Sequence, residues 1–255
     1  MKSIAQNHFD DEAGHYPVTI GQDYTQRLKW DILSSFASKT SFVADIGAAS
    51  GRHAVPMAER CAFVLALDLS FEMLSKLSGN ASINAPDQNL FPVVAQLPDL
   101  PIGTEKFDLV YCFATLLLLP IEQQNVAIEQ MVAALKPGGR LVLDLANRRS
   151  LGIHYWRRYY QKRGMAGIFG YGLSEVYSLL ARLGLNVDAI HPQGALSQLL
   201  LAPGVARVPG VNVAIRGGDG KPGWDDAVSR RFPSLAERWY VVAHRPGDEK
   251  ARGNR

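Results

Sequence analysis

Short runs of apolar residues, each long enough for one buried strand, recur through the middle of the chain. Between these runs the apolar positions change to helical spacing, as they do after Pro120, where Val126, Ile128 and Met131 are apolar. The pattern predicts strands that alternate with helices, as in an α/β protein. The predicted strands are residues 42–46, 63–68, 90–94, 107–113, 141–145, 185–190 and 238–244.

The first predicted strand leads through small residues into a stretch that is compatible with a helix. Asp45 lies near the end of this strand, and Gly47 and Gly51 follow it. Such a turn brings backbone N–H groups and a helix N-terminus close to a ligand, and glycines keep bulky side chains out of the way. Asp68 ends the next strand, where a carboxylate can accept hydrogen bonds from both hydroxyls of a ribose. A tight turn that binds no ligand is the alternative interpretation.

The glycine spacing separates two kinds of nucleotide-binding protein. A dinucleotide dehydrogenase carries G-x-G-x-x-G, which residues 47–51 do not supply. The order acid-x-Gly, small residues, Gly and then an acidic strand end resembles the class I S-adenosylmethionine-dependent methyltransferases, whose first motif reads D/E-x-G-x-G-x-G. Ala49 stands where this motif has its middle glycine. The stretches 95–110 and 135–143 resemble further motifs of the same family.

The resemblance covers about residues 9–192 and 238–246, and it implies a fold and a cofactor. The implied fold is a doubly wound, mostly parallel, seven-stranded Rossmann-like sheet whose last strand is antiparallel. The implied cofactor is S-adenosyl-L-methionine, with S-adenosyl-L-homocysteine as product. Gln96 takes the place of the acid that binds the adenine amino group, and its carbonyl oxygen can accept the same hydrogen bond. The implied cofactor-binding residues are Asp45, Gly47, Ala48, Gly51, Asp68, Leu69, Gln96, Leu97, Phe113 and Tyr16.

The parts of the chain around this body have separate expected roles. Residues 1–40 are expected to form N-terminal lid helices, because the family pattern F-D-x-x-A-x-x-Y reads Phe9 to Tyr16 here; packing of these aromatic residues on the sheet is the alternative. The methyltransferase domain is expected to span residues 41–246. It carries insertions at 147–172, on the substrate side, and at 192–237. Residues 247–255 are expected to be a frayed tail.

Two local signals set helix boundaries. Residues 80–89 are polar and contain Pro86, so a loop is expected there. Ser174 precedes a helical stretch that runs to Leu183, and serine is a favoured N-cap residue. We therefore expect that helix to begin at Ser174.

A stretch rich in arginine and aromatic residues follows the fifth predicted strand, so it begins at the edge of the sheet where ligands bind. We expect His154, Tyr155 and Trp156 to line a pocket for a partly aromatic or anionic acceptor. Aromatic rings give flat apolar contacts, and arginine recognises carboxylate or phosphate. An amphipathic helix with packed aromatic rings and solvated arginines is the alternative and fits the same spacing. Residues 192–237 are expected to cover the pocket.

The resemblance implies transfer of a methyl group to an O, C or N nucleophile of a small molecule, as in the ubiquinone and menaquinone biosynthesis methyltransferases. The sulfonium already makes the methyl group electrophilic, so orientation can supply much of the rate enhancement and no metal is needed. We assign no catalytic base, and we expect His53 to be structural. Two alternatives stay open: a catalytically silent protein that binds S-adenosylmethionine, because of Ala49 and Gln96, and a nicotinamide oxidoreductase, which the glycine spacing disfavours.

Composition limits the remaining classes of protein. Of the 255 residues, 47% are hydrophobic and 20% are charged, which is typical of a soluble globular protein. The net charge is only +3, so no nucleic-acid partner is expected. Cys61 and Cys112 lie in apolar runs and have no metal-binding spacing, so buried thiols and no metal site are expected. No apolar run is long enough to span a bilayer, so we expect a cytoplasmic protein whose partner is a small acceptor.

Overall fold

The computed structural model describes residues 2–84 and 89–247, which contain a seven-stranded sheet in the order β3-β2-β1-β4-β5-β7-β6. The pairs among β1 to β5 are parallel, whereas β7 runs antiparallel to both β5 and β6. The predicted doubly wound, mostly parallel sheet with an antiparallel last strand is therefore confirmed. The strands are β1 (Phe42–Ile46), β2 (Phe63–Asp68), β3 (Leu90–Val94), β4 (Phe107–Cys112), β5 (Leu135–Ala146), β6 (Asn186–Gln193) and β7 (Arg238–His244).

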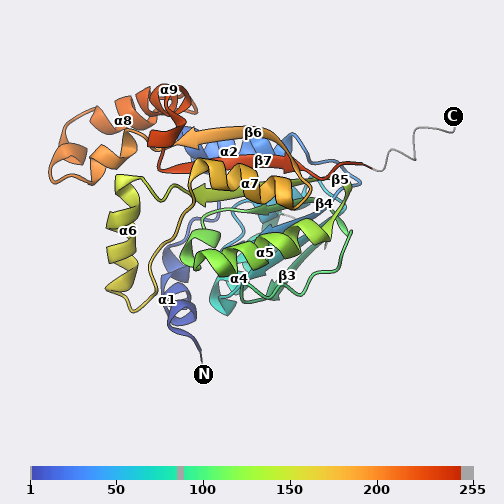
Figure 1. Cartoon of the computed structure of the whole chain (residues 1–255). Helices are drawn as coiled ribbons and strands as arrows, with labels where there is room; N and C mark the ends of the chain where they lie inside the picture. Colours follow the sequence, from blue (N-terminus) through green and yellow to red (C-terminus); the bar gives the residue numbers. More distant parts are fainter. Residues whose placement is uncertain (1, 85–88, 248–255) are drawn as a thin grey trace.

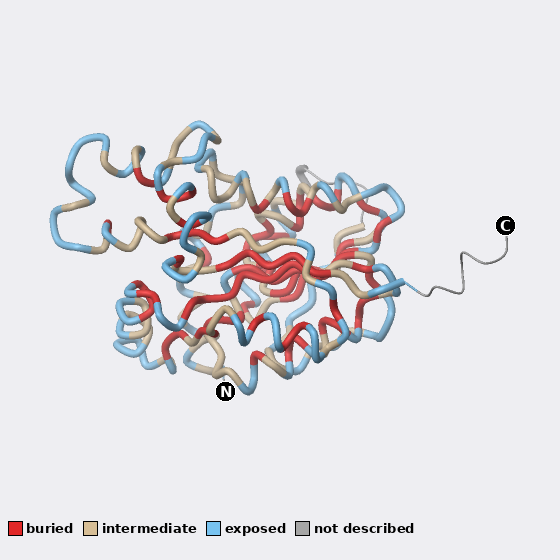
Figure 2. The backbone as a smooth tube through the Cα atoms, turned by 45° about the horizontal axis from the view of Figure 1, so that its top comes forward, coloured by how far each residue is buried: buried red, intermediate tan, exposed pale blue. Residues whose placement is uncertain are grey.

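Helices cover both faces of the sheet, and alternate side chains of each central strand face opposite layers. Val43 and Tyr111 pack in the cluster that includes residues of α2, α3 and α4, whereas Ala44 and Ile46 pack with residues of α5 and α7. Figure 2 shows the central strands as a band of buried backbone between these layers. The helices are α2 (Tyr24–Ser34), α3 (Ala54–Ala58), α4 (Phe71–Asn84), α5 (Ile121–Ala134) and α7 (Leu173–Arg182).

The parallel strands point toward one edge of the sheet, and further helices gather beyond that edge (Figure 1). They are α1 (Ile4–Glu12), α6 (Leu151–Gln161), α8 (Val211–Arg216) and α9 (Trp224–Arg231). Short 3-10 helices lie between the longer elements: η1 (Ala13–His15), η2 (Leu116–Leu118), η3 (Ser197–Leu201), η4 (Val205–Arg207) and η5 (Pro233–Leu235). The covered edge is the one at which open α/β sheets bind ligands, because the carboxyl ends of the strands meet there.

The helix α7 begins earlier than its sequence predicts. Its N-cap is Gly172, and the Glu175 carboxylate accepts a hydrogen bond from the Gly172 N–H at 2.8 Å. A carboxylate that reaches back to the cap residue satisfies an N–H group that the helix leaves free. The predicted cap at Ser174 is therefore wrong, because Glu175 supplies the capping group instead.

The loop predicted for residues 80–89 starts too early. The helix α4 continues to Asn84, and residues 85–88 lie outside the described residues. Most of the predicted tail, residues 248–255, also lies outside them. Across residues 2–84 and 89–247, none of the helices combines the length and apolar character that crossing a membrane requires.

Candidate functional site

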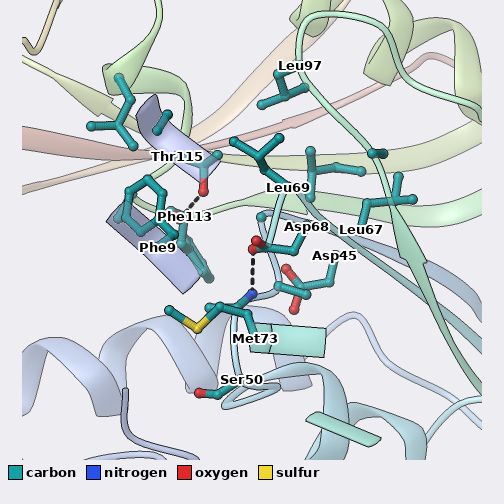
Figure 3. A pocket seen from close by; sticks show the side chains of 18 of the residues that line it. Phe9, Asp45, Ser50, Leu67, Asp68, Leu69, Met73, Leu97, Phe113 and Thr115 are labelled. Atoms are coloured by element: carbon teal, nitrogen blue, oxygen red, sulfur yellow. Dashed lines mark hydrogen bonds between the residues drawn. The ribbon is translucent and has the colours of Figure 1, made fainter. Parts of the chain in front are cut away.

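A cavity of about 360 Å³ lies where the carboxyl ends of β1, β2 and β4 meet, and Figure 3 shows the side chains that line it. Its walls come from the turn after β1, the end of β2, the segments after β3 and β4, and the N-terminal segment. The predicted cofactor residues that line it are Asp45, Gly47, Ala48, Asp68, Leu69, Gln96, Leu97, Phe113 and Tyr16. Among the described residues, Gly51 is the one predicted cofactor residue that does not line the cavity.

The glycines of the turn are required by packing inside the chain. Gly47 has a φ of +80°, and a Cβ atom there would overlap the side chain of Thr115. Gly51 has a φ of +86°, and its Cβ would lie 2.8 Å from Leu77 Cγ. Only glycine adopts such backbone conformations without strain. Close approach of a ligand is the reason that the sequence suggests for glycine at these positions. The packing of neighbouring side chains is a second reason, which the sequence does not reveal.

Ala49 occupies the left-handed region with a φ of +46°, although it is not a glycine. This conformation costs an alanine about 1–2 kcal/mol. It directs the Ala49 N–H to Asp68 Oδ2, with a donor–acceptor distance of 2.8 Å. The position thus needs the backbone geometry that the family supplies with glycine, and alanine adopts it under strain.

The Asp68 carboxylate connects the turn after β1 with the end of β2. Besides the bond from Ala49, its Oδ1 atom accepts a hydrogen bond from the Ser70 N–H at 2.9 Å. Burial raises the pKa of Asp68, and the backbone N–H bonds oppose that rise. Each carboxylate oxygen has two lone pairs, so both can still accept a bond from a ligand hydroxyl. Figure 3 shows this carboxylate at the cavity beside Leu69 and Asp45.

Asp45 is the more deeply buried of the two carboxyl groups, with 4% of its surface exposed. Its Oδ2 atom accepts a hydrogen bond from the Tyr111 hydroxyl at 2.8 Å, across the paired strands β1 and β4. Burial raises the pKa of Asp45 to about 7. A cationic group of a bound ligand would favour the charged form and lower this pKa again.

The N-terminal segment covers the cavity and is tied to the helix α4. Phe9, Tyr16 and Pro17 line the cavity. The ammonium group of Lys76 donates to the carbonyl oxygens of Ala13, Gly14 and Tyr16 at 2.9, 2.9 and 2.8 Å. Burial raises the pKa of Tyr16 to about 12, so its hydroxyl stays neutral at physiological pH. These contacts hold the segment over the ends of β1 and β2.

The charged or polar residues of the cavity that were not predicted as site residues include Lys29 and His53. Lys29, on α2, lines the cavity and is only 6% exposed. His53 also lines it, and burial lowers its pKa to about 3, so the ring is neutral. A signal for Lys29 exists in the sequence: it precedes Leu33 by four positions, so both lie on one face of a helix whose apolar residues are buried.

The predicted acceptor residues lie away from the cavity. His154 and Tyr155 are exposed on α6, while Trp156 is half-buried and packs on a cluster with Ile153 and Ile168. Of the described residues in the insertion 147–172, Met165 alone lines the cavity. The geometry therefore gives no support to an acceptor role for these three side chains, which stays a prediction.

Residues 43–139 match a family of proteins described as "Methyltransferase domain". The chain is 31% identical over 130 residues to a tRNA U34 carboxymethyltransferase of Hahella chejuensis, an alignment that covers 49% of this chain and 39% of the relative. The chain spans only 55% and 39% of the lengths of two curated relatives that it matches.

Solved structures share the fold over almost the whole chain. The [4+2]-cyclase SpnF superposes with a TM-score of 0.64 at 15% identity, covering 96% of each chain. The magnesium protoporphyrin IX methyltransferase ChlM of Synechocystis PCC 6803, with bound S-adenosylhomocysteine, gives a TM-score of 0.61 at 15% identity, covering 96% of this chain and 100% of ChlM. Residues 43–139 thus match a methyltransferase domain, and the described chain shares the Rossmann-like fold of solved S-adenosylmethionine-dependent methyltransferases such as ChlM.

Proposed function

We propose that the chain binds S-adenosyl-L-methionine in this cavity and transfers its methyl group to a small-molecule acceptor. One observation carries the proposal: the Asp68 carboxylate lies at the cavity at the end of β2, bonded to the strained turn after β1. A carboxylate at this place suits the two hydroxyls of a ribose. The solved structure of ChlM, which contains S-adenosylhomocysteine, has the same fold.

The residues of the cavity fit the parts of this cofactor. Asp68 would accept from the ribose hydroxyls, and the exposed Gln96 amide at the rim would bond to the adenine. Asp45, whose carboxyl group is neutral in part near pH 7, would face the cationic amino group of the methionine moiety. When bound, the cofactor supplies an electrophilic methyl group on its sulfonium.

The chain itself contributes position and the exclusion of water. Phe113 and Ala114 border the cavity at the end of β4, and Leu118 and Leu119 add an apolar wall after them. Phe9 belongs to the N-terminal segment, residues 1–40, which we propose as a lid over the domain of residues 41–246. An acceptor held under such a lid gains from orientation, which can supply much of the rate enhancement. The cavity of about 360 Å³ suits the cofactor, because drug-sized ligands occupy pockets of roughly 300–1,000 Å³.

The test is a turnover measurement with labelled cofactor. The purified chain is incubated with [methyl-³H]S-adenosylmethionine and either the small-molecule fraction of a cell extract or total tRNA. We expect S-adenosylhomocysteine to form and tritium to enter the small-molecule fraction. Asp68→Ala should lower turnover at subsaturating cofactor by about tenfold or more, because the ribose hydroxyls lose their acceptor.

Other outcomes would assign other functions. Tritium in tRNA would contradict a small acceptor and agree with the activity named for the Hahella relative. Binding of the cofactor without turnover on any fraction would favour the catalytically silent alternative. A [4+2]-cyclase shares the fold, so the fold alone does not fix the reaction.

A further inference from the structure

The ammonium group of Lys29 is a buried cation at the wall of the cavity. Only 7% of its side chain is exposed, and Lys29 lines the cavity. Its Nζ atom lies 5.0 Å from the ring centroids of both Phe113 and Tyr240. A charge so far removed from water costs free energy unless an opposite charge or several hydrogen bonds compensate it.

Among the described residues, Asp144 supplies the carboxylate within ion-pair distance of Lys29; its Oδ2 atom is shared with other groups, and its buried Oδ1 atom has no hydrogen-bond partner. Asp144 Oδ2 lies 3.7 Å from Lys29 Nζ, beyond ordinary hydrogen-bond distance. The same oxygen accepts from Arg238 Nη1 at 2.8 Å and from the Ala114 N–H at 3.2 Å. In the part of the chain that the structure describes, two buried cations thus share one carboxylate, and the Lys29 ammonium lacks a hydrogen-bonded anion.

Lys29 lies toward the end of the cavity that is remote from the ribose carboxylate. Asp68 ends β2, whereas the neighbours of Lys29 belong to strands on the other side of β1: Phe113 follows β4, and Asp144 lies on β5. Three strand spacings separate β2 from β5, or about 14 Å. If the cofactor lies across the carboxyl ends of β2, β1 and β4, the acceptor would lie beyond Phe113. Lys29 lies on that side of the cavity.

We propose that the Lys29 ammonium binds an anionic oxygen, a carboxylate or phenolate, on an acceptor that is otherwise apolar. The proposal rests on the proposed function and names the class of acceptor. A flat apolar body suits this cavity, because Phe113 lies beside the ammonium group and Phe9, Leu119 and Met165 also line the cavity. An anion at Lys29 would add to the compensating charge of Asp144, which Lys29 shares with Arg238.

The anionic oxygen could also be the carboxylate of the cofactor's methionine moiety, and a first experiment separates the two sources. S-adenosylhomocysteine and 5′-methylthioadenosine, which lacks that carboxylate, are titrated calorimetrically into the wild type, Lys29→Met and Lys39→Met. Lys39 is the control lysine. It precedes β1, at the opposite edge of the sheet, and its ammonium group donates to the carbonyl oxygen of Glu59, which follows α3. We expect each of the two variants to change the affinities for S-adenosylhomocysteine and for 5′-methylthioadenosine by less than about threefold. Selective loss of S-adenosylhomocysteine binding would overturn the proposal.

A second experiment tests the anion site directly, with the protein saturated by S-adenosylhomocysteine. Benzoate and its neutral analogue benzamide are the probes. We expect the wild type to bind benzoate about tenfold or more tightly than benzamide, and Lys29→Met to lose that preference. Equal binding of the two probes by the wild type, or benzoate binding unchanged in Lys29→Met, would overturn the proposal. Failure of S-adenosylhomocysteine itself to bind would instead overturn the proposed function.

A measurement on the wild type covers the case in which Lys29→Met does not fold. Burial lowers the pKa of Lys29 to about 8, against the opposing charge of Asp144; Arg238, Arg52, Asp23 and neutral His53 also face it. The arginines keep their charge through this range. Benzoate affinity should therefore be constant between about pH 6 and 7 and fall above about pH 8, as the ammonium loses its proton. A flat profile up to about pH 9.5 would overturn the assignment to Lys29.

Discussion

Gly47, in the turn after β1, is constrained both by its backbone conformation and by the space around it. Its backbone is left-handed, and the space where a Cβ atom would lie is filled by the side chain of Thr115. Gly138 has nearly the same φ, +79°, but nothing lies within 4 Å of the place for its Cβ atom. A substitution at Gly138 would therefore cause backbone strain alone, whereas the same substitution at Gly47 would cause backbone strain and steric overlap.

We predict that Gly47→Ala is far more damaging than Gly138→Ala. The second substitution should cost only the left-handed strain, about 1–2 kcal/mol of the free energy of unfolding. The first should add the displacement of Thr115, for a total of about 3 kcal/mol or more, and should weaken binding of S-adenosylhomocysteine. Urea unfolding and calorimetric titration measure both effects. Equal costs for the two substitutions would show that Thr115 moves aside freely.

Asp45 links stability to pH. Its pKa is raised to about 7 in the folded chain from about 3.8 in the unfolded chain, so the folded state prefers the neutral carboxyl. The stability that this group contributes is fully present below the pKa of the unfolded chain. It is lost as the pH rises through the pKa of the folded chain. We predict that Asp45→Asn stabilises the ligand-free chain, relative to wild type, by about 2–3 kcal/mol more at pH 8 than at pH 5. Asp11→Asn, at an exposed carboxylate, is the control. A parallel change in both variants would contradict the burial argument.

At the scale of elements, the N-terminal segment is held mainly through Lys76 on α4. A single ammonium group bonds three carbonyl oxygens at the end of α1 and in the turn that follows. Ser50 adds one bond from its hydroxyl to the Pro17 carbonyl at 2.9 Å. Asp10 accepts further hydrogen bonds from the Ser70 hydroxyl and the Glu72 N–H, so Lys76 is the largest single contributor among several contacts.

We predict that Lys76→Met loosens this cover without unfolding the domain. Affinity for S-adenosylhomocysteine should fall by about 1–2 kcal/mol, and amide hydrogen exchange in residues 4–17 should accelerate. Lys39→Met, whose ammonium bonds one carbonyl at the opposite edge, should change neither. Unchanged exchange in Lys76→Met would mean that other contacts hold the segment.

The helix α6 tests the acceptor pocket that the sequence suggested. Trp156 is half-buried against Ile153 and Ile168, whereas 48% of Tyr155 is exposed. We predict that Trp156→Ala lowers the free energy of unfolding by about 2 kcal/mol and that Tyr155→Ala changes it by less than about 0.5 kcal/mol. Turnover per folded molecule should be retained in both. Lost turnover in Tyr155→Ala, with normal stability and cofactor binding, would place this face of α6 at the acceptor.

The elements that could be predicted from the sequence are those whose signal is local. The strands β1 and β2 are covered on both faces, so they read as unbroken apolar runs, and the acid at the end of β2 could be located from them. The cap of α7 was misplaced because Glu175 competes with Ser174. Lys29 was missed because its role depends on Phe113, Asp144 and Tyr240, which are far from it in the sequence.

At the scale of the whole molecule, the sheet order brings distant parts of the chain to one edge. The central strands place the turn after β1, Asp68 and Phe113 around one cavity, and residues of the N-terminal segment complete its lining. The additions α6, α8 and α9 gather beyond the same edge, as Figure 1 shows. The strands thus supply the shared fold, whereas the activity depends on the residues placed around the cavity.

The central claim is that this cavity binds S-adenosylmethionine, and isothermal titration tests it most directly. S-adenosylhomocysteine and NAD⁺ are titrated separately into the wild type and into Asp68→Ala, with circular dichroism to show that the variant is folded. We expect that S-adenosylhomocysteine binds, that NAD⁺ does not, and that Asp68→Ala weakens binding by about 1–3 kcal/mol, because the ribose hydroxyls lose their acceptor. Tighter binding of NAD⁺, or unchanged affinity for S-adenosylhomocysteine in folded Asp68→Ala, would contradict the claim.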